Sequence, residues 1–340
     1  MSAPLPPNRP PAAQHRVGVL LLNLGTPDGT DYWSVRRYLG EFLSDPRVIE
    51  TPKWLWWPIL NLVILTVRPQ KAGHAYAQIW DKEKNESPLR VITRDQATAL
   101  AERLAGDGVM VDFAMRYGNP STRSVLEKMQ AAGCQRILLV PLYPQYSATT
   151  TATANDKAFE ALRRMRWQPA VRTAPAYYDD PKYVEVLGNS IRDGVAALDF
   201  EPDLVITSYH GLPQSYVDRG DPYEHHCHET TRLVRAYLGW PEDRLKVTFQ
   251  SRFGPSKWLE PATAETLQAL PAQGIRKVAV LAPAFSADCI ETLEELAMGG
   301  RETFIEAGGE KFAYIPCLNA SPAGMDMIEA MVRRELGGWV

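Results

Sequence analysis

An ionisable side chain follows one of the apolar runs of the chain directly. Leu204–Ser208 leads into Tyr209-His-Gly-Leu-Pro213, so His210 stands immediately before a glycine turn. An imidazole has an unperturbed pKa of about 6.5, so His210 could accept a proton or bind a metal ion near neutral pH. The alternative is that His210 only hydrogen-bonds the turn that follows it.

Three carboxylates follow the apolar run Val278–Ala282, at Asp288, Glu291 and Glu295. If a helix begins near Asp288, the three residues stand at i, i+3 and i+7 and share one face. A row of carboxylates beside a cleft could take up protons or conduct a hard cation. The spacing of Asp288 and Glu291 also fits a capping box, in which Glu291 turns back on the backbone, and spacing alone leaves both interpretations open.

The segment Glu224-His-His-Cys-His-Glu229 has the composition of a metal site. Only His225 and His228 have a favourable spacing for one helix face, and no second ligand cluster completes a zinc-like set. We therefore expect an exposed polar loop that could bind metal adventitiously.

The elements that must position these residues follow an alternating pattern, which is typical of parallel α/β architecture. Strands covered on both faces are predicted at four apolar runs: Val17–Asn23, Ile137–Pro141, Leu204–Ser208 and Val278–Pro283. Helical spacing predicts helices over Arg94–Leu104, Thr122–Ala132, Tyr183–Leu198 and Thr230–Leu238. Ligands bind beyond the carboxyl ends of such strands, which is where His210 and Glu291 stand.

Length and composition narrow the function. A chain of 340 residues exceeds one typical domain, and the similar patterns of residues 133–141 and 274–282 predict two lobes of similar fold. The formal charge, 37 − 40 = −3, gives no reason to expect nucleic-acid binding. The first predicted strand ends in Asn23-Leu-Gly-Thr-Pro27, which is neither a dinucleotide fingerprint nor a phosphate loop, and this argues against a nucleotide-dependent enzyme.

The cysteines and the N-terminus predict a cytoplasmic protein. Cys134, Cys227, Cys289 and Cys317 form no CxxC pair or disulfide-like framework, as expected for reduced thiols. Residues 1–15 are rich in proline and alanine without a signal-peptide core, so we expect a disordered lead-in.

One stretch, residues 54–67, is almost wholly apolar, with three tryptophans and basic residues on both sides. It is too short to span a bilayer, which needs about 20 apolar residues, and Pro58 interrupts it. It could be a buried core helix, or an exposed apolar lip suited to a membrane interface.

Taken together, seven motifs in order resemble the ferrochelatase family, whose members insert ferrous iron into a porphyrin to make haem. The matching segments are residues 22–27, Met115-Arg-Tyr-Gly-Asn-Pro120, Pro141-Leu-Tyr-Pro-Gln-Tyr-Ser147, Ser208-Tyr-His-Gly-Leu-Pro213, Gly220-Asp-Pro-Tyr223, Phe249-Gln-Ser-Arg-Phe-Gly-Pro255 and residues 284–295. The resemblance extends from Val17 to about Pro322. It implies two Rossmann-like lobes facing a porphyrin cleft, residues 16–175 and 176–322, and a C-terminal helix, residues 323–340, that packs back on the first lobe.

The resemblance also implies roles for particular residues. His210 matches the family's essential histidine and Glu291 its catalytic glutamate, and Glu295 continues an acidic path; these three are the candidate metal-contacting residues. The expected porphyrin-binding residues are Leu24, Tyr76, Ser87, Arg116, Tyr117 and Trp258. Residues 54–67 fall at the family's pocket lip, which favours the exposed interpretation. Whether His210 or Glu291 takes the proton is not decided by sequence.

Relatives that carry an iron–sulfur cluster differ from this chain. They place one cluster cysteine where this chain has Ala148 and the others in a C-terminal extension, so we expect no [2Fe-2S] cluster here and no other cofactor. Cys289 stands where many relatives have a histidine, which puts a metal role for that position in doubt. The expected partners are porphyrin and ferrous iron, with peripheral contact at the inner membrane and an oligomer as open possibilities.

The apolar lip favours protoporphyrin IX, a poorly soluble substrate, over the more carboxylated coproporphyrin III. Other hypotheses are a chelatase for another tetrapyrrole and a non-catalytic binding protein for metal or tetrapyrrole. A non-catalytic binding protein would not need His210 and Glu291 to act together, which argues against this hypothesis.

Overall fold

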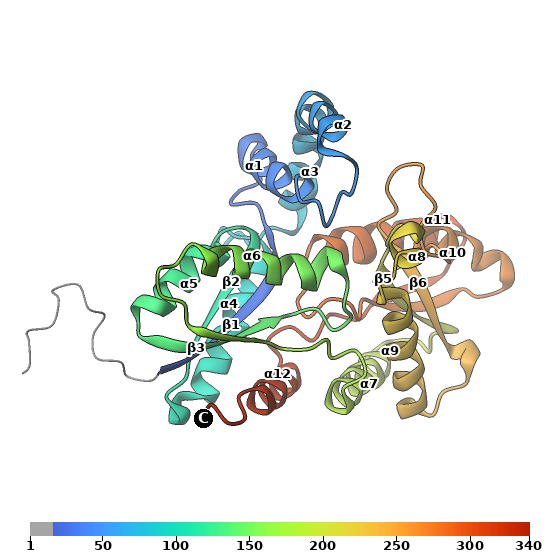
Figure 1. Cartoon of the computed structure of the whole chain (residues 1–340). Helices are drawn as coiled ribbons and strands as arrows, with labels where there is room; N and C mark the ends of the chain where they lie inside the picture. Colours follow the sequence, from blue (N-terminus) through green and yellow to red (C-terminus); the bar gives the residue numbers. More distant parts are fainter. Residues whose placement is uncertain (1–15) are drawn as a thin grey trace, which may run out of the picture.

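The protein is described by a computed structural model over residues 16–340, so the predicted lead-in, residues 1–15, lies outside the described residues. Two four-stranded sheets, in which every neighbouring pair of strands is parallel, form the centres of two lobes (Figure 1). The prediction of two Rossmann-like α/β lobes is confirmed.

The N-terminal sheet has the strand order β2-β1-β3-β4. Its strands are β1 (Arg16–Thr26), β2 (Met110–Gly118), β3 (Cys134–Pro141) and β4 (Ala170–Thr173). Three helices cover it: α4 (Pro88–Arg103), α5 (Thr122–Ala131) and α6 (Thr153–Arg163), the last preceded by the short π-helix η3 (Ala148–Ala152). Leu20 and Leu22 pack with α5 and α6, whereas Val19 and Leu21 pack with α4, because successive strand residues point to opposite faces. Both faces of β1 are therefore apolar.

The C-terminal sheet has the order β6-β5-β7-β8. Its strands are β5 (Leu204–His210), β6 (Leu245–Gln250), β7 (Lys277–Leu281) and β8 (Lys311–Tyr314). Its helices are α7 (Pro181–Ala196), α8 (Gln214–Asp218), α9 (Tyr223–Leu238), α10 (Thr263–Ala269), the π-helix η6 (Glu291–Gly300) and α11 (Arg301–Glu306). His210 and Glu291 thus stand at the end of a strand and at the start of a helix in the same lobe.

One hydrophobic core joins the lobes. It contains Leu21 and Leu138 of the first sheet, Val205 and Leu281 of the second, and buried side chains of α4, α7 and α9. Helix α12 (Pro322–Glu335) contributes its apolar face to this core and packs on α4 and α7. The two sheets are therefore held by shared packing.

The apolar lip, residues 54–67, is exposed. It lies within α2 (Lys53–Pro58), the π-helix η1 (Ile59–Ile64) and α3 (Leu65–Ile79), which group with α1 (Tyr32–Leu43) at one end of the first lobe (Figure 1). Trp54 is 78% exposed and Leu62 71%, whereas Leu60 and Leu65 anchor the segment in a small core. Within residues 16–340 no helix is long and apolar enough to cross a membrane. Of the two interpretations, the exposed lip is the one that the structure supports.

Candidate active site

His210 is the last residue of β5, and its ring is held in one tautomer. Nδ1 lies 2.7 Å from the carbonyl oxygen of Gly211. A carbonyl oxygen can only accept a hydrogen bond, so Nδ1 carries the hydrogen and Nε2 of the neutral ring keeps its lone pair. No hydrogen bond within residues 16–340 engages Nε2. The ring does bond its turn, as one hypothesis held, but this bond leaves the other nitrogen available for chemistry.

Gly211 makes this turn possible. Its N–H donates to the carbonyl oxygen of Gln250 at 2.7 Å, and a Cβ on Gly211 would lie 2.6 Å from that oxygen. The same Cβ would lie 3.2 Å from the ring of Trp258, whose backbone pairs with Pro213. Trp258 is thereby packed against the turn that carries His210.

Gln250 joins His210 to the carboxylate helix. It pairs with His210 in the β5–β6 ladder, and its side-chain amide donates to the carbonyl oxygen of Glu291 at 2.8 Å. Ser208 fixes the other end of that amide by donating to Oε1 at 2.8 Å. A buried glutamine that is hydrogen-bonded at both ends of its amide therefore sets the start of η6 beside the end of β5.

Glu295 lies one turn further along η6 and is held by both oxygens. The backbone N–H and the hydroxyl of Ser251 each donate to it at 2.7 Å. Burial raises the pKa of Glu295, and the charge of Glu291 raises it further; the bonds from Ser251 and the nearby His210 oppose this without cancelling it. A carboxyl group with a raised pKa can take up and release protons closer to neutral pH. π-helical turns are often found at functional sites.

The structure corrects the expectation for Asp288. Its carboxylate accepts bonds from Thr292, Tyr314 and Asn319, and its own N–H donates to the side chain of Asn319. The capping box with Glu291 does not form, because that N–H is already engaged. Asp288 also does not continue the row of Glu291 and Glu295, because its oxygens are committed to side chains around β8.

Two of the predicted porphyrin residues, Tyr76 and Ser87, line one small cavity together with Glu291 and Cys289. Burial raises the pKa of Tyr76, and the charge of Glu291 adds to this, so the phenol stays protonated. Leu24 is half-buried and packs beside this cavity, against Leu89 and Cys289. These three predicted residues thus lie at or beside the cavity that Glu291 lines.

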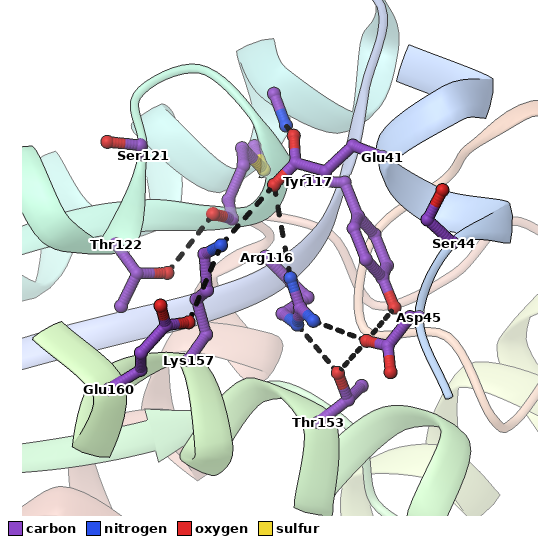
Figure 2. Close-up of polar contacts among 12 residues, drawn as sticks. Glu41, Ser44, Asp45, Arg116, Tyr117, Ser121, Thr122, Thr153, Lys157 and Glu160 are labelled. Carbon is purple, nitrogen blue, oxygen red and sulfur yellow. Dashed lines mark hydrogen bonds and ion pairs between the residues drawn. The ribbon is translucent and has the colours of Figure 1, made fainter. Parts of the chain in front are cut away.

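Arg116 and Tyr117 form a different cluster with Asp45 and Thr153 (Figure 2), and Tyr117 also packs in the small core that anchors the lip. Arg116 pairs with Asp45 and donates from Nε to Thr153 at 2.6 Å, and the Tyr117 hydroxyl donates to Asp45 at 2.8 Å. Burial alone would raise the pKa of Asp45, but the bonds that it accepts from the Thr153 hydroxyl, the Arg47 backbone N–H and the Tyr117 hydroxyl, together with the charge of Arg116, lower it overall. Neither Arg116 nor Tyr117 shares a hydrogen bond with His210 or Glu291.

A cavity of about 380 Å³ also lies in the first lobe. It lies between α1, the turn after β2 and α6, and its lining includes Glu41, Asn119 and Lys157. Thr26 and Tyr38 line it too; Thr26 also lines the cavity beside Glu291, and the Tyr38 ring lies edge-on to Tyr76. The two cavities are therefore adjacent, with Thr26 and the Tyr38–Tyr76 pair between them.

The histidine-rich segment is helical, which contradicts the predicted loop. It forms the first two turns of α9, with Cys227 buried and His226 stacked on Tyr178 at 3.6 Å. His226 also accepts the backbone N–H of Tyr146 at Nδ1. Within residues 16–340, no three His, Cys, Asp or Glu side chains are arranged to hold a metal ion.

Residues without an assigned role in the sequence complete the site. Gln250 and Ser251 fall in a matching motif, Phe249–Pro255, but only the structure shows that they hold Glu291 and Glu295. Membership of that motif was the available signal. Ser251 has a φ of 63°, in the left-handed region that residues other than glycine seldom adopt. Residue propensities therefore do not predict this backbone conformation for a serine.

Known proteins similar to this chain agree with one another. The family model described as Ferrochelatase matches residues 16–336. The ferrochelatase of Mesorhizobium japonicum is 60% identical over 332 residues, which cover 97% of this chain and 94% of that protein. The ferrochelatase of Rhizobium meliloti is 57% identical over 332 residues, covering 97% and 98%.

Among solved structures, SirB from Bacillus subtilis with Fe³⁺ covers 95% of this chain and 97% of its own, with a TM-score of 0.56 and 12% identity. The sirohydrochlorin chelatase SirB in complex with cobalt, from Bacillus subtilis subspecies spizizenii, matches with a TM-score of 0.52 and the same identity, covering 95% of this chain and 97% of its own. At this identity the likeness is one of fold alone.

Proposed function

The chain belongs to the ferrochelatase family, and from that membership we propose that His210 and Glu291 carry out its insertion of ferrous iron into protoporphyrin IX. The enzyme forms nitrogen–metal bonds in the last step of haem biosynthesis. The reaction replaces two pyrrole protons by one Fe²⁺ ion, so charge balances when two H⁺ leave. The protein must therefore accept protons near the porphyrin nitrogens and release them to solvent.

The observation that carries the proposal is the free Nε2 of His210. The bond from Nδ1 to Gly211 fixes the tautomer, so Nε2 offers a lone pair to a pyrrole N–H. Protonation at Nε2 gives an imidazolium, and its Nδ1–H still donates to the carbonyl oxygen of Gly211. We assign His210 as the first proton acceptor on these grounds.

Glu291 and Glu295 provide the onward path. Glu291 lines the cavity beside Tyr76, and the raised pKa of Glu295 suits a group that protonates and deprotonates in each turnover. Carboxylates and a single imidazole also bind a divalent first-row ion loosely, which is appropriate for a substrate that must be passed on. The incoming iron would contact His210, Glu291 and Glu295 in passing, because within residues 16–340 these side chains do not form a ready three-ligand site.

The porphyrin would lie between these groups and the first lobe. Leu24, Tyr76, Ser87 and Trp258 surround the Glu291 cavity or the His210 turn. Arg116 and Tyr117 would contact the other part of the ring from beneath the lip. A cleft that holds the ring out of plane would expose a nitrogen lone pair to the metal.

We also propose that the enzyme carries no iron–sulfur cluster. Cys134 lies in β3 and Cys227 in α9, whereas Cys289 and Cys317 flank Asp288, so the four thiols do not surround one point. A [2Fe-2S] cluster requires four such ligands. The test is to measure iron and acid-labile sulfide in protein purified without oxygen, and stoichiometric sulfide would refute the proposal.

The apolar lip would place the enzyme at a membrane. We propose that the protein works in the cytoplasm with the lip against the inner membrane, where protoporphyrin IX partitions. Exposed tryptophans together with Lys53 and Lys71 match the chemistry of an anionic lipid interface.

The first experiment is anaerobic incubation with Fe²⁺ and protoporphyrin IX, with haem formation followed in the visible spectrum and coproporphyrin III compared in parallel. We expect enzyme-dependent haem, its loss in His210→Ala, and a strong decrease in Glu291→Gln. Circular dichroism confirms that each variant is folded. A folded protein without turnover on either porphyrin would overturn the proposal, and retained turnover in His210→Ala would overturn the role of that residue.

A further inference from the structure

A seam of hydrogen bonds joins the two lobes where the segment after β3 runs along α9. Three consecutive residues of this segment each donate one bond across the seam: Gln145 to Thr230 (3.0 Å), Tyr146 to His226 (3.1 Å) and Ser147 to Asp221 (3.0 Å). Thr230 and His226 are one helical turn apart, and Asp221 lies just before the helix. The segment is thereby held in register with the start of α9.

Asp221 serves both lobes with one carboxylate. Oδ2 accepts the backbone N–H of Ala148 at 2.8 Å as well as the hydroxyl of Ser147, and Oδ1 accepts the backbone N–H of Tyr223 at 3.1 Å. Ala148 is the first residue of η3, which continues into α6, and Tyr223 is the first residue of α9. The first N–H groups of a helix lack partners within the helix and carry partial positive charge. One anion therefore caps two helices that belong to different lobes.

In the N-terminal lobe, the helix that Asp221 caps, η3–α6, contacts the side chain of Arg116. Thr153, the first residue of α6, accepts Nε of Arg116 at 2.6 Å and donates to Asp45. Figure 2 shows the guanidinium of Arg116 directed at these two side chains. Thr153 of α6 and Asp45 therefore hold the guanidinium of Arg116 together, so a shift of η3–α6 would move one of its two main partners.

In the C-terminal lobe, Asp221 is connected through a short stretch of chain to His210. From His210 at the end of β5, the chain passes through the Gly211 turn and α8 to Asp221, all within the second lobe. Through its hydrogen bonds to Ser147 and Ala148, Asp221 therefore links the lobe that carries His210 to the lobe that carries Arg116.

We propose that Asp221 is a positioning residue for porphyrin binding. It caps η3–α6 from the opposite lobe and so holds Arg116 at a fixed place relative to His210. The inference rests on the proposed function, because it takes Arg116 to contact the porphyrin. Asp221 does not touch the substrate, and its effect passes through Thr153.

The test is the affinity for free porphyrin, measured by fluorescence titration without metal, for the full chain and its Asp221→Ala variant. We expect the Kd to rise about tenfold, which corresponds to about 1.4 kcal/mol. The kcat at saturating porphyrin and the KM for Fe²⁺ should stay within about twofold, because the chemistry at His210 is not touched. Asp221→Asn, which keeps one acceptor, should give an intermediate Kd.

Asp180→Ala is the matched control. Asp180 caps α7 by accepting the N–H groups of Lys182 and Tyr183, and it also pairs with Arg334, but it has no link to α6. We expect this variant to lose melting temperature while it keeps the porphyrin Kd. A purely structural role for Asp221 would give the same result in both aspartate variants.

Arg116→Gln separates failure of this inference from failure of the proposed function. If Arg116→Gln binds porphyrin as the parent does, the binding assignment itself is wrong. If Arg116→Gln weakens binding but Asp221→Ala does not, only the positioning role is overturned. In the double variant we expect no further loss beyond Arg116→Gln, and a fully additive loss would overturn the route through Arg116.

Discussion

At the scale of single residues, the proton transfer proposed for His210 depends on how little room the turn behind this residue has. Gly211 approaches the Gln250 carbonyl so closely that its absent side chain is a structural requirement. Trp258 closes the other side of the same turn. The free Nε2 of His210 is thus a product of backbone packing more than of the imidazole itself.

A single methyl group at this turn should therefore disable the enzyme. In Gly211→Ala, the new Cβ lies 2.6 Å from a carbonyl oxygen, so the turn has to shift and His210 with it. A displacement of about 1 Å can cost about 100-fold in rate, and we expect kcat/KM to decrease by at least that factor. Unfolding free energy should decrease by about 1–3 kcal/mol. Gly106→Ala, where a Cβ meets nothing within 4 Å, is the control and should keep full activity.

Glu295 should give the stability of the protein a recognisable pH dependence. Its pKa in the folded protein is raised above the ordinary value of 4.5, so the folded state holds its proton more tightly than the unfolded chain does. The stability that this proton contributes is complete below pH 4.5 and is lost as pH rises through the folded-state pKa. Glu295→Gln cannot lose a proton and keeps an acceptor for Ser251. We expect its melting temperature, relative to the parent, to increase as pH rises above 4.5.

The control for this experiment is Glu294→Gln. Glu294 is the preceding residue of η6, and its side chain makes no hydrogen bond or ion pair in the part of the chain that the structure describes. Its melting temperature relative to the parent should be the same at each pH. A constant difference for Glu295→Gln as well would show that burial does not set the protonation of Glu295.

At the scale of elements, the sequence predicted the buried strands better than the edge strands. The four predicted strands overlap β1, β3, β5 and β7, which are the two central strands of each sheet. These strands are apolar on both faces and have a continuous signal. The edge strands β2, β4, β6 and β8 were not predicted, because they are short or interrupted by polar residues such as Asp112 and Lys246, and only pairing with a neighbour makes them strands.

The site shows the same division. His210 and Glu291 became candidates because each comes after a continuous apolar strand, and their roles were predicted from the family resemblance. The tautomer of His210 could not be predicted, because it depends on the direction of the neighbouring Gly211 carbonyl. The double contact of Ser251 with Glu295 and the separate Arg116 cluster could not be predicted either, since they join residues distant in the sequence. The histidine-rich segment was wrongly predicted to be a loop, because its successive polar residues show no apolar helical face. The buried face of the helix extends beyond the segment and includes small polar residues: Tyr223, Cys227, Thr230, Thr231 and Val234.

The apolar lip is the element that should bring the enzyme to lipid. Trp54 and Trp57 are 78% and 63% exposed and stand next to Lys53. In Trp54→Gln/Trp57→Gln, we expect binding to anionic lipid vesicles in a sedimentation assay to weaken about tenfold or more, since each buried aromatic ring contributes about 1.5–3 kcal/mol. The melting temperature should hardly change. Trp167→Gln, at an exposed position outside the lip, should bind vesicles as the parent does; equal binding by all three proteins would contradict a membrane role.

At the scale of the whole molecule, the two lobes behave as parts of one packed body. The core that contains β1 and β3 also contains β5 and β7, and the seam at Asp221 adds polar contacts between the lobes. A cleft built between two such lobes can hold His210 and Arg116 at a constant separation. This rigidity fits an enzyme whose substrate is a large, flat and stiff ring.

Helix α12 gives a direct test of that unity. Ile328 is 1% exposed and packs in the shared core, so Ile328→Ala should lower the unfolding free energy by about 2–5 kcal/mol. Because the core is common to both sheets, urea unfolding should remain a single transition, with tryptophan fluorescence and far-UV circular dichroism coinciding. Ile305→Ala, at a position 37% exposed, should cost far less. Two separated transitions in Ile328→Ala would instead mean that each lobe folds on its own core, with α12 acting only as a strap between them.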